Sequence, residues 1–159
     1  MQGKQIAIRR ATADDSRAVH EIVLQALRET NAKDYPASVI ERLVLTLPEK
    51  VASSLEIWHA FVAIADGRVV GTASLSGNTV KSVFVHPDYQ RGGVATKLMG
   101  AVEDAALAQS VHLLNVPSSI TAQLFYAKCG FSIVREEFYG EERTIIMSTA
   151  LSGGSPINP

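Results

Sequence analysis

The segment that decides the fold is VFVHPDYQRGGVATKLM, residues 83–99. Its first residues are β-branched and aromatic, which is typical of a strand, and Pro87 and Asp88 then turn the chain. Gly92 and Gly93 follow, and the apolar residues after them recur at helical spacing. The first turn of a helix has unpaired N–H groups and a partial positive charge, and glycines let an anion approach closely. This strand–glycine–helix junction therefore predicts a phosphate or pyrophosphate site.

Other interpretations of the same junction are weaker or narrower. Arg91 adds a positive charge beside the glycines, but a tight turn with two flexible residues would also explain them. The chain has neither the G-x-G-x-x-G dinucleotide fingerprint nor the G-x-x-x-x-G-K-[ST] phosphate loop. A binding module for nucleotide phosphates with another fold is therefore an alternative that only the junction itself favours.

The segments before the junction predict two helices and a meander of strands. Alternating apolar residues indicate a strand over 5–10, and Thr12 with Asp15 forms an approximate capping box for a first helix that fades near Asn31. A second helix begins at Pro36, and Pro48 marks its end or a kink. Strands follow at 57–65, 68–75 and 79–86, the first two joined by the hairpin signal Asp66-Gly67.

The segments after the junction complete a mixed sheet. We expect a helix over 92–108, a strand over 111–116, a short helix over 119–129 and final strands over 131–137 and 143–150. Strands mostly in antiparallel succession with helices inserted give an α+β, or mixed α/β, class. We expect one domain over 1–151 and a flexible tail over 152–159, SGGSPINP.

Composition excludes several classes of protein. With 47% hydrophobic and 19% charged residues, the chain of 159 residues is not a disordered protein. Its 15 basic and 16 acidic residues give a net charge of -1, which argues against a nucleic-acid partner. It has no apolar run long enough for a bilayer and no signal peptide, so we expect no membrane partner. One cysteine, Cys129, favours a reducing cytoplasm and excludes a cysteine zinc site.

Two motifs resemble those of the GNAT superfamily of acyl-CoA-dependent N-acetyltransferases. The central motif of that family is a strand ending V-x-P, followed by [QR]-x-x-G-x-[GA] at a helix start. A second element, A-x-x-F-Y-x-x-x-G-F, follows at the expected distance. The resemblance extends over about residues 5–150 and is weakest over 28–56. The residues that match are Val85, Pro87, Gln90, Gly93 and Ala95 in the first motif, and Ala122, Phe125, Tyr126, Gly130 and Phe131 in the second.

The resemblance implies a fold, a cosubstrate and a reaction. A mostly antiparallel central sheet would carry helices on both faces and splay into a wedge for coenzyme A. Acetyl-CoA would be the cosubstrate, the backbone N–H of Val85 the oxyanion donor, and Tyr126 the general acid for the departing thiolate. An amine would attack the thioester directly. The cofactor residues implied are Val83, Phe84, Val85, Gln90, Arg91, Gly92, Gly93, Val94, Ala95, Thr96, Ser119 and Lys128.

Two positions depart from the pattern of that family. Ser119 stands where many members have asparagine, which weakens or reroutes a contact to pantetheine. Thr79 stands where many members have a carboxylate general base. The base is therefore another group, a water relay, or unnecessary for an amine of low pKa. A CoA-binding sensor or regulatory module without turnover is the alternative that this absence supports.

Acceptor residues are expected near the first two helices. Tyr35 lies between these helices, Glu29 and Asp34 lie nearby and could attract an ammonium group, and His59 could face the acceptor cavity. The acceptor would be a primary amine on a small molecule, a peptide terminus or a protein lysine. Four scattered histidines without ligand spacing predict no metal. The sequence leaves the oligomeric state open, a homodimer included.

Overall fold

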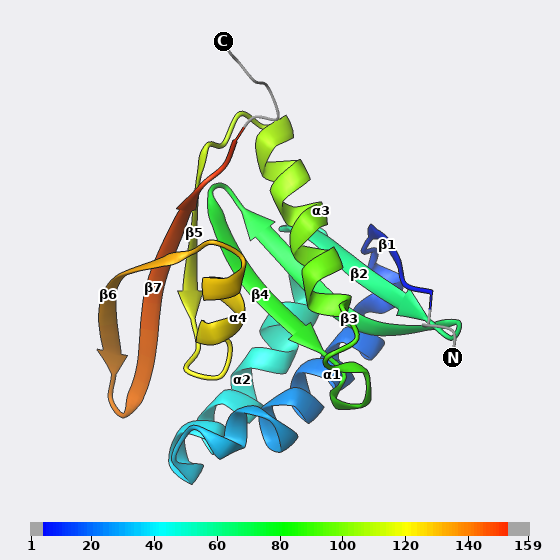
Figure 1. Cartoon of the computed structure of the whole chain (residues 1–159). Coiled ribbons are helices and arrows are strands. Elements are labelled where there is room, and N and C mark those ends of the chain that lie inside the picture. The colour runs from blue at the N-terminus through cyan, green and yellow to red at the C-terminus, as the bar shows by residue number, and fades with distance from the viewer. Residues whose placement is uncertain (1–4, 153–159) are drawn as a thin grey trace.

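The computed structural model describes residues 5–152, and within that range the chain forms four helices, three short 3-10 turns and seven strands (Figure 1). Of the expected tail over 152–159, all but Ser152 lies outside the described residues. The helices are α1 (Ser16–Glu29), α2 (Ala37–Ser53), α3 (Val94–Ala108) and α4 (Gln123–Lys128). The strands are β1 (Ala7–Arg10), β2 (His59–Ala65), β3 (Arg68–Ser76), β4 (Thr79–Val85), β5 (Leu113–Ser118), β6 (Ser132–Tyr139) and β7 (Glu142–Ala150).

The described strands form one sheet in the order β1-β2-β3-β4-β5-β7-β6. Neighbours pair antiparallel except β4 and β5, which are parallel and share one register pair, Thr79 with Asn115. The Asn115 N–H also donates to the Asn78 carbonyl at 2.8 Å. Beyond this point β4 and β5 diverge, as Figure 1 shows, so the α+β class and the splayed sheet expected from the sequence are confirmed.

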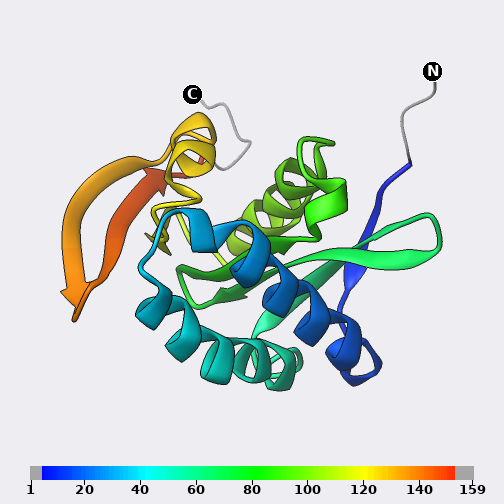
Figure 2. The ribbon, with the colours of Figure 1, turned by 90° about the horizontal axis from the view of Figure 1, so that it is seen from below.

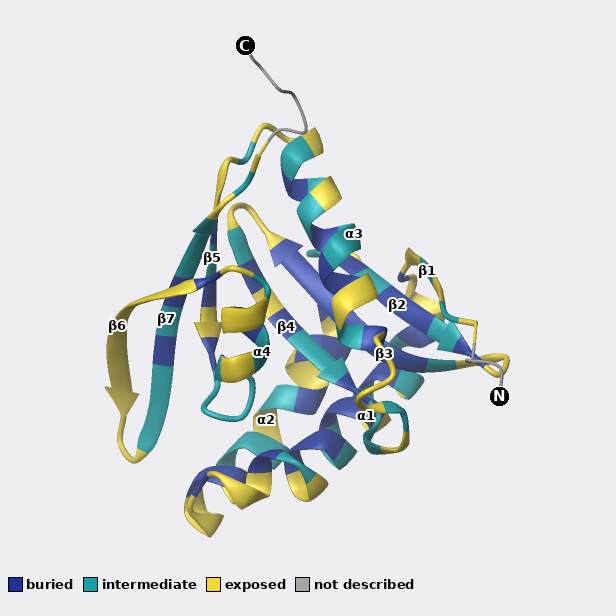
Figure 3. Ribbon diagram, in the orientation of Figure 1, coloured by how far each residue is buried: buried dark blue, intermediate teal, exposed yellow. Residues whose placement is uncertain are grey.

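Helices cover both faces of the sheet. In Figure 2, α1 and α2 lie on one face and α3 and α4 on the other. Figure 3 shows the buried residues between these layers, and β6 exposed at the sheet edge. The larger core cluster joins α3 and α4 to the sheet, and a smaller one lies beneath α1 and α2. Large side chains with 2% exposure or less in the first cluster include Leu75, Leu98, Met99, Leu114, Ile145 and Met147.

Several predicted boundaries differ from the structure, and three of the differences have a clear physical cause. Helix α2 continues through Pro48 to Ser53, so Pro48 is not its end; Val51 and Ala52 beyond it are buried, and their packing offsets the lost backbone hydrogen bond. Helix α3 begins at Val94 rather than residue 92, because Gly93 has a left-handed φ of 87°. Strand β5 spans 113–118 rather than 111–116, a shift set by its register with β7.

Candidate active site

The divergence of β4 and β5 opens a cleft of about 550 Å³. Its walls come from β4, β5, β7, the end of α1, the middle of α2 and of α4, the loop before α3 and the first turn of α3. Most of the predicted site residues line it: Tyr35, Val83, Phe84, Val85, Gln90, Arg91, Gly93, Val94, Ala95, Thr96, Ser119 and Tyr126. A second hollow, between the start of α1 and the end of α2, is lined by none of them.

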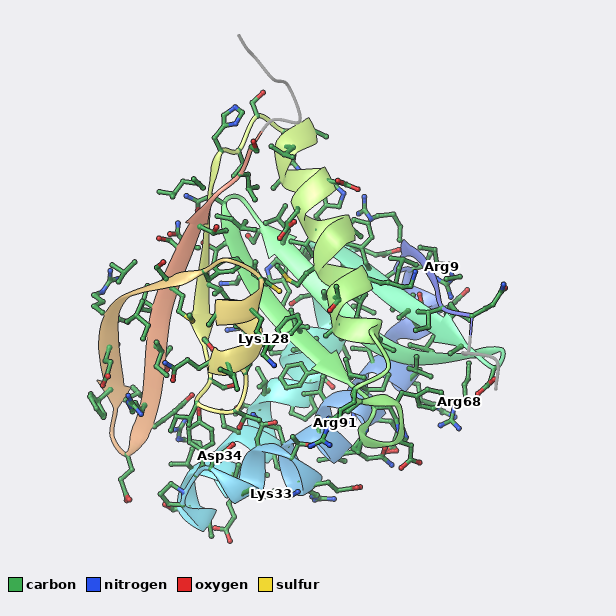
Figure 4. All side chains as sticks on the ribbon, viewed as in Figure 1. Arg9, Lys33, Asp34, Arg68, Arg91 and Lys128 are labelled. Atoms are coloured by element: carbon green, nitrogen blue, oxygen red, sulfur yellow. The ribbon has the colours of Figure 1, made fainter. Side chains whose placement is uncertain are left out.

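The loop before α3 has a backbone suited to an anion. Arg91 and Gly93 adopt φ values of 66° and 87°, so two left-handed residues flank Gly92. Alternating conformations of this kind turn successive N–H groups toward one side, and the first N–H groups of α3 have no partner within the helix. Arg91, labelled in Figure 4, belongs to this loop and lines the cleft. This end of the cleft can therefore bind a phosphate group through backbone N–H groups and one guanidinium.

The last residues of β4 present backbone groups to the cleft. The His86 N–H donates to the Val70 carbonyl of β3 at 2.8 Å. Because N–H groups alternate along a strand, the Val85 N–H points to the opposite edge, where β5 has diverged. The Val85 carbonyl points the same way and accepts from Gln90 Nε2 at 3.4 Å. Gln90 also donates to Thr30 Oγ1 at 3.1 Å, which ties the end of β4 to the end of α1.

Tyr126 is 3% exposed, yet it contributes to the wall of the cleft. Its ring packs against Phe125 and Phe131, with centroids 5.3 and 5.5 Å apart. Burial, and to a lesser extent the nearby Cys129 thiol, raise the pKa of the Tyr126 hydroxyl. The phenol is therefore protonated at neutral pH and can donate a proton.

The segment that begins α2 joins the two sides of the cleft. Tyr35 Oη accepts from the Ile120 N–H at 2.7 Å and donates to the Arg143 carbonyl at 3.3 Å. Thr121 Oγ1 donates to Asp34 Oδ2 at 2.7 Å. One turn into α2, Arg42 donates to Glu142 Oε1 at 2.8 Å. We call these contacts the α2 clamp. They hold the β5–α4 loop and β7 against α2.

The remaining predicted residues do not line the cleft. Glu29 is exposed at the end of α1, and Gly92 is exposed in the loop before α3. Lys128 is exposed at the end of α4, and in the view of Figure 4 it points toward β4. Asp34 takes part in the α2 clamp without lining the cleft.

His59 lies at the far end of the sheet. Its ring nitrogens are 2.8 Å from Arg10 Nη1 and 3.0 Å from Gln109 Nε2. Gln109 follows the last residue of α3, whereas the cleft adjoins the first. A helix of this length spans about 22 Å, so His59 cannot face the cavity assigned to it from the sequence.

Several cleft residues were not singled out from the sequence. They include Asn31, Leu43 and Leu47 from the helices, and Lys81, Ser82, Glu142 and Thr144 from the strands. The alternation of β4 could have drawn attention to Ser82, but a bulge in that strand changes which side chains share a face. The contribution of β7 comes from long-range pairing, which leaves no local signal.

Residues 5–152 contain neither a cluster of metal-binding side chains nor a membrane-spanning helix. They contain no group of three or more His, Cys, Asp or Glu side chains placed to hold a metal ion. No helix in that range is both long enough and apolar enough to cross a membrane.

The sequence and the fold match known acetyltransferases. Residues 24–146 match the model of the acetyltransferase (GNAT) domain. An uncharacterized N-acetyltransferase of Escherichia coli, YafP, is 30% identical over 132 residues, which is 83% of this chain and 85% of that protein.

Solved structures are similar over nearly the whole chain. A GCN5-related N-acetyltransferase from Rhodopseudomonas palustris superposes with a TM-score of 0.88 at 26% identity, covering 95% of this chain and 99% of that one. The PaiA N-acetyltransferase of Thermoplasma acidophilum in complex with coenzyme A superposes at 0.76 with 18% identity, covering 92% and 99%. With its splayed sheet, its helix start and the match over 24–146, this chain belongs to the GNAT family and is an acyltransferase.

Proposed function

We propose that the protein transfers the acetyl group of acetyl-CoA to a primary amine by direct attack on the thioester. The observation that carries this proposal is the outward-facing backbone of β4, with the Val85 N–H directed into a cleft that ends at the anion-binding start of α3. Both features fit coenzyme A, because that molecule has an extended amide-bearing arm joined to a pyrophosphate.

The cosubstrate would lie along β4 and against α3. Its pantetheine arm would pair with the open backbone edge of Val83–Val85 as an added strand, and its pyrophosphate would bind N–H groups of residues 91–96 with help from Arg91. Gln90, Phe84 and the first turn of α3 would frame the arm. Ser119 contributes less than an asparagine would, since its Oγ already accepts from the Ala122 N–H at 3.0 Å.

The chemistry then requires an oxyanion donor and an acid. The amine nitrogen forms a bond to the thioester carbon, and the Val85 N–H stabilises the negative oxygen of the intermediate. When the carbon–sulfur bond breaks, Tyr126 donates its proton to the departing thiolate. Thr79 is not placed to act as a base, because its hydroxyl donates to Asn78 at the far end of β4, where the wedge is closed. The proton lost by the amine therefore passes to water. Tyr126 then regains a proton from water, and the products are an amide and free coenzyme A.

A panel of primary amines tests the proposal. Small-molecule amines, peptides with free N-termini and lysine peptides are incubated with acetyl-CoA, with thiol release followed by a disulfide reagent and acetylated product by mass spectrometry. We expect at least one acceptor to release thiol above the rate of acetyl-CoA hydrolysis, with an equal amount of amide. Tight binding of CoA with no acceptor-dependent thiol release would instead favour a CoA-binding sensor that lacks turnover.

A further inference from the structure

Two cationic residues that line the cleft, Lys81 and Arg91, make no ion pair with a described residue. Besides Tyr side chains, the ionisable residues among the described ones that line the cleft are Lys81, Arg91 and Glu142. Arg91 lies at the anion-binding end, and Glu142 is paired with Arg42. Lys81 makes no ion pair with a described residue; its Nζ lies 5.6 Å from the centroid of the Trp58 ring. A cation beside an aromatic face keeps its capacity to donate hydrogen bonds to an anion.

A bulge in β4 places a buried hydroxyl next to Lys81. In the register of β3 with β4, Leu75 faces Val80 and Ser74 faces Ser82, so Lys81 is the extra residue. Ser82 lines the cleft, is 8% exposed, and its Oγ has no hydrogen-bond partner among the described residues. An unpaired buried hydroxyl costs free energy, and a ligand that supplies the missing partner recovers it. Neither Lys81 nor Ser82 donates a side-chain hydrogen bond to a described residue, and the Oγ of Ser74, which faces Ser82 in this register, is likewise unpaired among the described residues.

The position of Lys81 and Ser82 along β4 sets their distance from the reacting end of the cleft. Ser82 precedes Val85, the proposed oxyanion donor, by three residues, which corresponds to about 10 Å along a strand. Leu43 and Leu47 of α2 supply an apolar wall of the same cleft. An acceptor whose amine reacts beside Val85 would therefore extend a chain of methylene groups past these leucines toward Ser82.

We propose that Lys81 and Ser82 bind a carboxylate at the far end of the acceptor, so that the preferred substrates are long amino carboxylates. This inference rests on the proposed acetyl transfer, because the distance is measured from the reacting end of the cleft. It adds a substrate class and two binding residues that the reaction itself does not require.

Two amines that differ only in the carboxylate test this inference. 6-Aminohexanoate and hexylamine have primary amines on unbranched methylene chains, and kcat/KM for each is measured at saturating acetyl-CoA. We expect wild-type protein to prefer 6-aminohexanoate by about tenfold to a hundredfold, the size of a charge-assisted hydrogen bond. Lys81→Met and Ser82→Ala should bring this ratio toward one. The matched control is Lys50→Met, because Lys50 is an exposed lysine of α2 outside the cleft.

Calorimetry separates failure of this inference from failure of acetyl transfer. Each amine is titrated into protein saturated with CoA, with and without Lys81→Met. If neither amine is acetylated but 6-aminohexanoate binds more tightly than hexylamine in a manner lost in Lys81→Met, the carboxylate site stands and the proposed function for these acceptors falls. Equal or undetectable binding of the two amines, or a kcat/KM preference that survives both substitutions, overturns the carboxylate site.

Discussion

The hydroxyl of Tyr126 is a single group whose removal tests the proposed chemistry. We predict that Tyr126→Phe lowers kcat by roughly 10–10³-fold, since general acid catalysis typically contributes about 10²–10⁴-fold and a thiolate already leaves readily. The KM for acetyl-CoA should change little, because the phenyl ring keeps its packing against Phe125 and Phe131. Steady-state kinetics with the best amine measures both. Tyr139→Phe is the control, because Tyr139 is 70% exposed and keeps its ring beneath Arg42.

The raised pKa of Tyr126 adds a pH dependence. Burial disfavours the phenolate, so the acid stays protonated above the ordinary tyrosine pKa near 10. We therefore expect no fall in kcat from ionisation of Tyr126 up to about pH 10. A pH–rate profile of the wild type and Tyr126→Phe measures this. Near-normal kcat in the variant would contradict the assignment of Tyr126 as the acid. An alkaline limb well below pH 10 that disappears in the variant would instead contradict the raised pKa of Tyr126.

A single residue could be predicted where its role produces a pattern in the neighbouring sequence. Asp66 and Gly67 formed a recognisable turn pair, and both have the positive φ, 53° and 72°, that such a turn requires. Thr12 and Asp15 form the expected capping box, but on the 3-10 turn Ala13–Asp15 that leads into α1 rather than on α1 itself. Ser82 was missed because its role depends on the register between β3 and β4, and His59 was misplaced because a strand pattern does not specify which end of the sheet a residue occupies.

At the scale of one element, substitutions of two glycines, Gly93 before α3 and Gly100 inside it, test whether the start of α3 binds an anion. We predict that Gly93→Ala lowers the free energy of unfolding by about 1–2 kcal/mol, because alanine resists the left-handed conformation of Gly93. Gly93→Glu carries the same backbone strain and adds a negative charge beside the proposed pyrophosphate. CoA affinity should therefore fall further in Gly93→Glu than in Gly93→Ala. Urea unfolding and calorimetric CoA titration measure the two quantities.

Gly100 provides the matched control for these substitutions. It lies inside α3, and a Cβ built there meets nothing within 4 Å. Gly100→Ala should stabilise the protein by roughly 0.5–1 kcal/mol, since glycine is unfavourable in a helix interior. Its CoA affinity should match that of the wild type. Equal CoA affinity in Gly93→Ala and Gly93→Glu would show that the pyrophosphate does not bind at this end of the cleft.

Element order was more predictable than element boundaries. Periodicity specified the helices and the strand meander, because each element has an apolar face that repeats locally. The end of α2 and the bounds of β5 depend on what they pack against: buried Val51 holds the helix beyond Pro48, and pairing with β7 sets the span of β5. Such tertiary contacts override local signals, so the boundaries shifted while the order did not.

In the molecule as a whole, the cleft separates strands β1–β4 from strands β5–β7, and the two parts are connected at both ends of the cleft. At one end β4 and β5 share a single register pair within the described chain, and at the other the α2 clamp connects α2 with the β5–α4 loop and β7. The ion pair of Arg42 with Glu142 is partly exposed, and such pairs contribute about 0–1 kcal/mol. The two hydrogen bonds of Tyr35, which is 9% exposed, are therefore the principal connection. The sequence placed Tyr35 at the acceptor site but could not foresee these partners, more than 80 residues away.

The hydroxyl and the ring of Tyr35 can be separated by two substitutions. Tyr35→Phe keeps the ring in the cleft wall but leaves the Ile120 N–H and the Arg143 carbonyl without their partner, so we expect a loss of about 1–3 kcal/mol in the free energy of unfolding. The amide of Ile120 should exchange hydrogen faster, and kcat should fall because the loop leading to Tyr126 loses its anchor. Tyr35→Ala also removes the ring and should raise KM for the amine far more than KM for acetyl-CoA. Hydrogen exchange and steady-state kinetics measure these effects, with Tyr139→Phe again as the control. If Tyr35→Phe shows the hydrogen exchange and kcat of the wild type while Tyr35→Ala raises only the KM for the amine, Tyr35 is an acceptor contact and the clamp contributes nothing. If Tyr35→Ala changes KM equally for the amine and for acetyl-CoA, the acceptor binds elsewhere.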